Sequence, residues 1–128
     1  MSKNIGYLED KSGNTLLPTI VNTITNSNGT ALQLSDGTMI CYGSKSFTVT
    51  CNQSVGNIFY TAQVSLGNYP ANFIDTPVLM IGGGTGALNY IEHNYSGGSS
   101  LGYCWFWNPT SRPQATIRVG FLAIGKWK

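Results

Sequence analysis

The chain has 128 residues, carries charge on only 9% of them, and has a formal net charge of +2. This length fits one domain with a core of its own. Lysine and arginine are scattered rather than clustered, so we expect no nucleic-acid partner. We also expect no membrane insertion and no secretion signal, because the sequence has neither a long apolar run nor a charged and then apolar N-terminus.

The cysteines predict free thiols. Cys41, Cys51 and Cys104 are an odd set without C-x-x-C spacing, and His93 is the single histidine that could join them in a metal site. Buried reduced thiols are therefore favoured over a disulfide such as Cys41 to Cys51. We expect neither a metal nor another cofactor.

Residues 1–27 are weakly patterned. They contain a turn at Lys11–Asn14 and an apolar stretch at Ile20–Ile24, but too few apolar residues for an independent core. We predict a short, extended N-terminal segment or linker, which either pads the main domain or packs against another chain. The main domain is expected over residues 28–128.

The clearest local pattern is a β-hairpin. Ala31–Leu34 and Thr38–Tyr42 are apolar stretches that flank Ser35-Asp36-Gly37. Asp-Gly readily supplies the positive φ angles that a tight hairpin turn requires. We therefore predict two antiparallel strands joined by this turn.

Further strands follow at short spacing. Lys45–Cys51, Ile58–Leu66, Leu88–Tyr95 and Leu101–Trp107 alternate between two residue types, which is typical of half-buried strands. The alternation places Thr61, Gln63 and Ser65 on a solvent-facing side of the second segment. Pro77–Ile81 is continuously apolar, which predicts a buried strand.

The terminal segment Ala115–Lys128 is apolar on both faces, with Ile117, Val119 and Phe121 on one and Leu122 and Ile124 on the other. This pattern predicts a covered central strand. Since no segment reads as a long amphipathic helix, we predict an all-β, antiparallel β-sandwich over residues 28–128.

Recognisable catalytic motifs are missing from the sequence. Gly82–Gly86 lacks the ending and the strand-to-helix context of a phosphate-binding loop. Glu92 and His93 are adjacent in one predicted strand and point to opposite faces, so they cannot form a simple acid–base pair. We expect a protein that is not an enzyme. A catalytic site formed by residues of two subunits stays open, because the sequence of one chain does not reveal it.

Aromatic residues gather between positions 90 and 107, among asparagines and serines. Flat rings beside amides and hydroxyls suit sugars, which have C–H patches and hydroxyl rims. The alternative is that the rings, above all those of Trp105 and Trp107, form core or subunit interface. The candidate glycan platform consists of Tyr90, Glu92, Tyr95, Tyr103 and Trp105.

Three motifs carry a family resemblance. Asp36–Gly43 reads Asp-Gly-Thr-Met-Ile-Cys-Tyr-Gly, Ala123–Lys128 reads Ala-Ile-Gly-Lys-Trp-Lys, and Gly6–Thr19 contains Gly-Tyr-Leu, Asp-Lys-Ser-Gly-Asn and Leu-Pro-Thr. Together they resemble the C-terminal head domains of bacteriophage tail fibres and receptor-binding proteins from phages and prophages of Gram-positive bacteria. The resemblance covers both ends and the first hairpin, and leaves Asn52–Pro113 largely unmatched.

The resemblance implies a homotrimeric, β-rich head that attaches a virion to a carbohydrate or protein of the host bacterial surface. Its other partners would be tail proteins, and its location the tail tip of the virion, after synthesis in the bacterial cytoplasm. It transfers no binding residues. Leu122 and Ile124 are then expected to face a threefold neighbour. A purely structural virion component and a glycan depolymerase with an intersubunit site stay open as alternatives.

Overall fold

A computed structural model describes residues 7–9, 15–83 and 90–128. Within these ranges the regular elements are eleven strands, all paired antiparallel, which confirms the predicted all-β class. No helix in the described ranges could cross a membrane. The strands are β1 (Tyr7–Glu9), β2 (Thr15–Pro18), β3 (Ile20–Asn26), β4 (Gly29–Leu34), β5 (Thr38–Val55), β6 (Ile58–Thr61), β7 (Val64–Ser65), β8 (Val78–Gly83), β9 (Tyr90–Ser96), β10 (Ser100–Asn108) and β11 (Arg112–Lys126).

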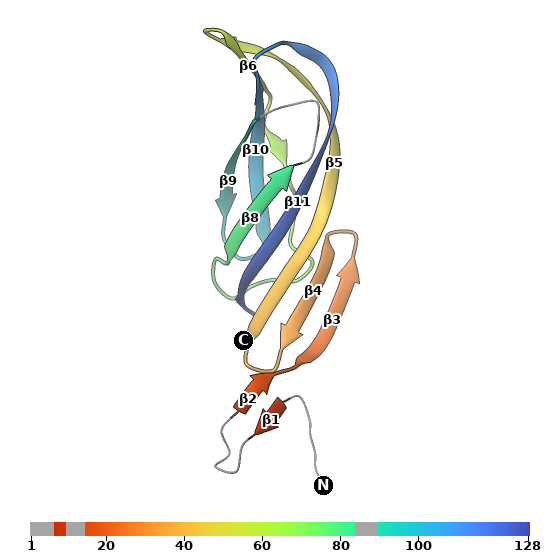
Figure 1. The fold of residues 1–128 in the computed structure, drawn as a ribbon, viewed down its shortest axis with the longest axis vertical. Helices are drawn as coiled ribbons and strands as arrows, with labels where there is room; N and C mark the ends of the chain where they lie inside the picture. The colour runs from red at the N-terminus through yellow and green to blue at the C-terminus, as the bar shows by residue number, and fades with distance from the viewer. Residues whose placement is uncertain (1–6, 10–14, 84–89) are drawn as a thin grey trace.

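The main sheet begins earlier than the sequence predicted. β1 and β2 form a two-stranded sheet of their own, at the end of an elongated molecule (Figure 1). β3, however, pairs with β4 in the nine-stranded main sheet, from Asn26 opposite Gly29 to Ile20 opposite Leu34. The last part of the expected N-terminal segment thus joins the main sheet, because Ile20–Asn26 finds its hydrogen-bonding partner in the next strand.

The predicted Asp-Gly hairpin is confirmed between β4 and β5. Gly37 has a φ of 95° and donates its N–H to the Leu34 carbonyl at 3.1 Å. The Asp36 carboxylate accepts a hydrogen bond from the Thr38 N–H at 2.9 Å, which lowers the pKa of Asp36. Positive φ is confined to the glycine, as in a turn followed by a left-handed residue.

The terminal strand is central, as predicted. β11 pairs with β5 from Lys126 opposite Thr38 to Arg112 opposite Cys51, and with β8 on its other edge. Ile117 and Val119 are fully buried. The pairing of β11 has no register shift between Ala115 and Lys126, so strand alternation is kept throughout this stretch.

A second group of strands surrounds β10, which pairs with β9 on one edge and with β6 and β7 on the other. Buried side chains of both groups form one core cluster, in which Phe106 of β10 joins Ile117 of β11. Cys41, Cys51 and Cys104 are buried in this cluster and are free, as the sequence predicted.

Two expectations about exposure are wrong. Thr61 was expected to face solvent, but it is 1% exposed, and its Oγ1 accepts a hydrogen bond from the Phe106 N–H and donates one to the Ala62 carbonyl. The cause is a break between β6 and β7 that interrupts the alternation. β8 was expected to be buried, yet Val78 is 70% exposed and Met80 53%.

The hairpin motif and the C-terminal motif of the resemblance are in contact. The Trp127 N–H donates to the Gly37 carbonyl, and the indole Nε1 of Trp127 donates to the Leu34 carbonyl, both at 2.9 Å. Gly125 packs so closely on Phe73 that a Cβ there would lie 2.8 Å from the ring. The Asp-Gly turn and the chain's last residues therefore form one structural unit.

Candidate functional site

Strand alternation in β10 separates its aromatic side chains from its core side chains. Cys104 and Phe106 are buried, whereas Tyr103 is 45% exposed and Trp105 and Trp107 are half-buried. The alternation predicted for Leu101–Trp107 is confirmed. Three rings in alternate positions thus lie on the outer side of one strand.

Neighbouring strands add polar groups beside these rings. Glu92 of β9 lies opposite Trp105, and Asn94 lies opposite Tyr103. Both polar side chains are exposed. The indole Nε1 of Trp107 donates a hydrogen bond to Glu92 Oε1 at 3.2 Å. Tyr60 of β6 lies opposite Trp107, with ring centroids 4.9 Å apart and a 33° angle between the rings. We call the following set the aromatic face: Tyr60, Glu92, Asn94, Tyr103, Trp105 and Trp107.

The structure brings together three of the five predicted platform residues, namely Glu92, Tyr103 and Trp105. Tyr90 and Tyr95 belong to β9, but their side chains lie outside the described part of the structure. His93 is half-buried, unlike its exposed neighbour Glu92, and its Nε2 lies 2.6 Å from the Leu101 carbonyl. This contact ties His93 to the backbone of β10 rather than to Glu92.

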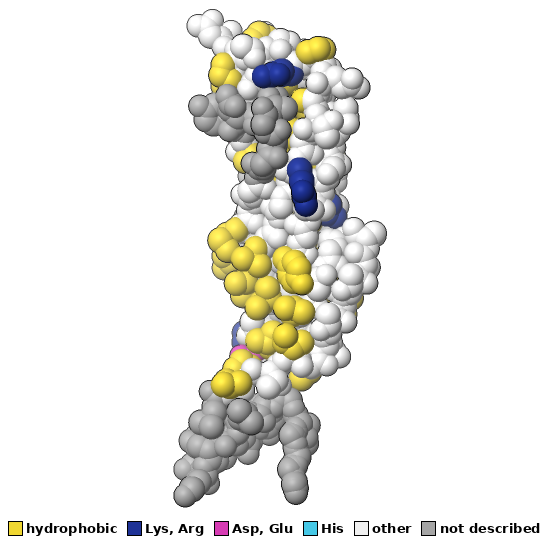
Figure 2. Space-filling view, turned by 45° about the vertical axis from the view of Figure 1, so that its right-hand side comes forward, with side chains coloured by type: hydrophobic (Ala, Val, Ile, Leu, Met, Phe, Trp, Pro, Cys, Tyr) yellow, Lys and Arg dark blue, Asp and Glu magenta, His cyan; other side chains and the backbone are white. Residues whose placement is uncertain are grey.

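A second surface is apolar. On the outer side of three adjacent strands, Leu122 of β11 lies between Tyr42 of β5 and Met80 of β8, and Ile124 lies between Ile40 and Val78. Figure 2 shows hydrophobic side chains gathered densely on one side of the lower half of the molecule. We call the following set the apolar face: Ile40, Tyr42, Val78, Met80, Leu122 and Ile124.

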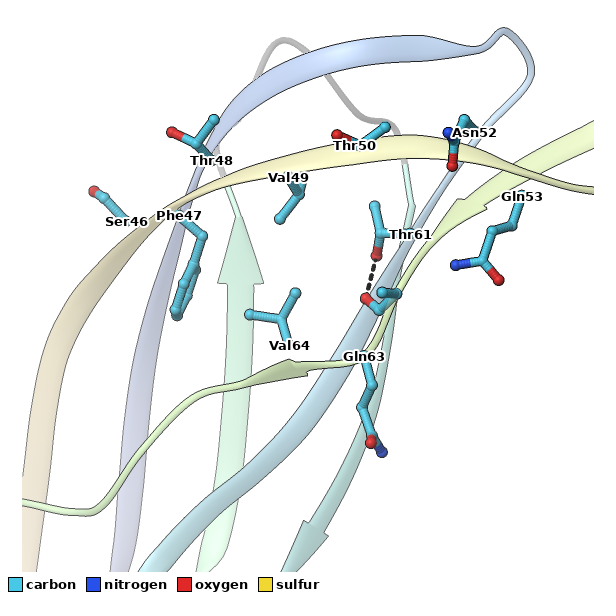
Figure 3. Close-up of a pocket in the computed structure, with 11 residues that line it drawn as sticks. Ser46, Phe47, Thr48, Val49, Thr50, Asn52, Gln53, Thr61, Gln63 and Val64 are labelled. Carbon is cyan, nitrogen blue, oxygen red and sulfur yellow. Dashed lines mark hydrogen bonds between the residues drawn. The ribbon is translucent and has the colours of Figure 1, made fainter.

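A third feature is a hollow between β5 and the β6–β7 connection (Figure 3). Its volume is about 860 Å³, and it is partly open to solvent. Phe47, Val49 and Val64 point into it from opposite sides. The sequence does not reveal this hollow, because Phe47 and Val49 have the alternation of ordinary core residues.

Ionisable groups are sparse near these surfaces. Burial raises the pKa of Cys41 and of Cys104 to about 11, so both thiols stay protonated at neutral pH and are poor nucleophiles. Burial also lowers the pKa of Lys45, whose Nζ donates to Asn28 Oδ1 at 3.2 Å. Among the described residues, no three histidine, cysteine or carboxylate side chains are grouped to hold a metal ion.

Comparisons of the chain with protein families, with curated proteins and with solved structures found no match.

Proposed function

We propose that the chain is the β-sandwich head of a homotrimeric phage tail fibre or receptor-binding protein, and that it attaches the virion to a cell-wall glycan of the host bacterium. The aromatic face carries this proposal. Tyr103 and Trp105 offer ring surface to the C–H side of a sugar, while Glu92 and Asn94 beside them offer an acceptor and an amide to its hydroxyls.

The apolar face supports the trimeric part of the proposal. Large apolar side chains that are exposed or half-buried on three adjacent strands form the kind of contiguous surface that soluble proteins use as interfaces. Leu122 and Ile124 were expected at a threefold contact, and the unshifted register of β11 keeps them on the side opposite Phe121. Three copies would present three aromatic faces, and weak sugar contacts would then combine through effective concentration.

The contact between the hairpin motif and the C-terminal motif supports the family resemblance. Short matches at distant positions arise easily by chance, whereas the hydrogen bonds of Trp127 join the matched ending to the matched hairpin. The two matched motifs therefore pack against each other and belong to one unit of the fold.

Co-sedimentation of the full chain with purified cell walls of Gram-positive bacteria tests the proposal. We expect retention of the wild type, and we expect soluble wall glycan to compete for it. A chain that binds no wall from any candidate host would contradict the receptor role.

The second candidate is a structural component of the virion that makes no receptor contact. The apolar face favours it, because that surface fits a protein partner without needing a sugar. In this case the Trp107–Glu92 hydrogen bond would only stabilise β9 on β10. Assembly without wall binding would select this candidate.

A further inference from the structure

The hollow arises from a gap in the pairing of β5. On one edge of β5, β4 pairs with Met39–Tyr42 and β6 pairs with Cys51–Val55. Between these two pairings, Gly43–Val49 pair with β11 on the other edge, and no described strand pairs with them on this edge. This stretch therefore faces the hollow with an unpaired strand edge, whose backbone supplies hydrogen-bond donors and acceptors.

The same gap leaves core-facing side chains uncovered. Phe47 and Val49 share the strand alternation of Cys41 and Cys51, which are fully buried where β4 and β6 pair. Phe47 and Val49 themselves remain only half-buried, as does Val64 on the opposite wall. The hollow thus has a flat ring and two aliphatic side chains as its apolar lining (Figure 3).

The polar part of the lining is uncharged. The amides of Asn52, Gln53 and Gln63 lie at its border, and none of the described residues that line the hollow is charged. A charged ligand would lose its hydration without gaining an ion pair, which is costly. Amides and backbone groups offer both donors and acceptors, which suits hydroxyl groups because these also donate and accept.

The ends of the gap restrict the size of the ligand. β4 and β6 occupy the same edge of β5 on either side of the gap, so an added peptide strand would meet one of them after a few residues. A small molecule meets no such limit. A volume of about 860 Å³ is typical of small-ligand pockets.

We propose that this hollow is a second sugar subsite, which takes a neutral monosaccharide unit with its C–H side against Phe47. The attribution of that unit to a host glycan rests on the proposed function, whereas the ligand class rests on the lining alone. The subsite is separate from the aromatic face, which belongs to the outer side of β10.

Titration of the ¹⁵N-labelled full chain with glucose, galactose and N-acetylglucosamine, followed by NMR, tests the subsite. We expect amide shifts centred on Phe47–Thr50 and on Val64. Glucuronic acid is the charged counterpart of glucose and is expected to bind more weakly, since the lining offers its carboxylate no cation. The absence of shifts with every neutral sugar, or shifts centred on Tyr103 and Trp105 alone, would overturn the proposal.

Two substitutions locate the binding. Val64→Phe narrows the space opposite Phe47 and should greatly reduce the shifts, while Phe47→Leu removes the ring plane and should weaken binding about threefold to tenfold. Phe59→Leu is the matched control, because Phe59 is also half-buried against the core but does not line the hollow. Binding unchanged in both a folded Phe47→Leu and a folded Val64→Phe variant would place the sugar elsewhere.

Cell-wall co-sedimentation separates this inference from the proposed function. If the wild type is retained on walls but no neutral sugar perturbs the hollow, the subsite is wrong and the receptor role stands. If a sugar binds in the hollow but no wall retains the chain, the subsite stands and the receptor role fails.

Discussion

The apolar face and the aromatic face differ in what surrounds an equally exposed tyrosine. Tyr42 and Tyr103 are each 45% exposed. Tyr42 lies opposite Leu122 and Thr30, whereas Tyr103 lies opposite Asn94 and Ser65, so only Tyr42 has an apolar cross-strand neighbour. The exposure of an aromatic ring therefore says little about its use, and its cross-strand neighbours decide which partner it fits.

This difference suggests two kinds of contact. A surface of leucine, isoleucine, valine and methionine gains mainly from being permanently removed from water, as in obligate subunit interfaces. Rings set among a carboxylate, an amide and a hydroxyl can exchange water for sugar hydroxyls reversibly. One domain can carry both surfaces, because strand alternation turns the inner sides of β10 and β11 toward a shared core.

The largest expected effect comes from a charge in the apolar face. Met80→Asp places a carboxylate beside Leu122, where an assembled trimer would bury it without a partner. We expect at least a roughly hundredfold loss of association, measured by sedimentation equilibrium, with a folded monomer as the product.

Asn94→Asp introduces the same charge on the aromatic face and is the control, since Asn94 is exposed there. It should leave assembly unchanged. A wild-type chain that is monomeric at micromolar concentration, or equal assembly of the two variants, would contradict the division of the faces.

Adjacent residues of β10 give the next largest effect. Phe106 is 1% exposed and Trp105 is half-buried on the outer side. Phe106→Ala should destabilise the domain by about 3–5 kcal/mol, because it leaves a cavity in the shared core. Trp105→Ala should cost less stability and mainly affect sugar binding. Urea denaturation measures both, and a larger loss for Trp105→Ala would reverse the assignment of inner and outer sides.

The buried thiols test whether the two faces share one core. Cys41 lies in β5 and Cys104 in β10, and burial raises the pKa of each from 9.0 to about 11. Between these values the unfolded chain loses thiol protons that the folded chain keeps, so the free energy of unfolding falls as pH rises. Stability from this source is fully present below pH 9.0.

Cys41→Ala and Cys104→Ala provide the readout, because tyrosine and lysine also titrate in this pH range. Each variant should lose stability less steeply than the wild type as pH rises, in thermal unfolding followed by circular dichroism. Equal slopes for wild type and both variants would show that the thiols titrate alike in the folded and unfolded chains.

The matched tyrosines give a smaller effect that addresses the comparison directly. Tyr103→Ala should weaken wall binding about tenfold per site and leave assembly intact. Tyr42→Ala should weaken assembly and affect wall binding only through the lost valency. Both are read by co-sedimentation and light scattering on the same samples. If Tyr42→Ala weakened wall binding in a fully assembled sample, the receptor contact would lie on the apolar face.

The sequence predicted most faithfully where strands keep their register. Alternation separated Trp105 from Phe106 correctly, because β10 pairs with β9 without a register shift from Tyr103 to Trp107, but it did not show which of the two faces the core. The alternation gave the wrong side for Thr61. The break between β6 and β7 depends on the pairing of β7 with β10, and the residues around Thr61 give no sign of it. The sequence also predicted that Val78 is buried. A continuous apolar run does not reveal whether the residues that would bury it belong to the same chain.

The hollow could not be predicted for a related reason. Nothing in Phe47–Thr50 distinguishes a strand with two partners from a strand with one, because the missing pairing lies between β4 and β6. Of the candidate platform, the sequence could identify the ring residues of β10 from their parity. It could not foresee that Tyr60 would pack against Trp107, since β6 meets β10 only through tertiary pairing.

The smallest expected effect is that of Glu92→Gln. The substitution keeps an oxygen that can accept the hydrogen bond from Trp107 Nε1 and removes only the charge of an exposed carboxylate. We expect stability to change by less than about 0.5 kcal/mol, and wall binding to change little, because a sugar hydroxyl can donate to an amide oxygen as well. A depolymerase that used Glu92 as its acid or base would instead lose turnover altogether, since an amide cannot exchange the proton. Release of reducing sugars from cell walls by the wild type, abolished in Glu92→Gln with wall binding retained, would make the aromatic face a catalytic site rather than a binding surface.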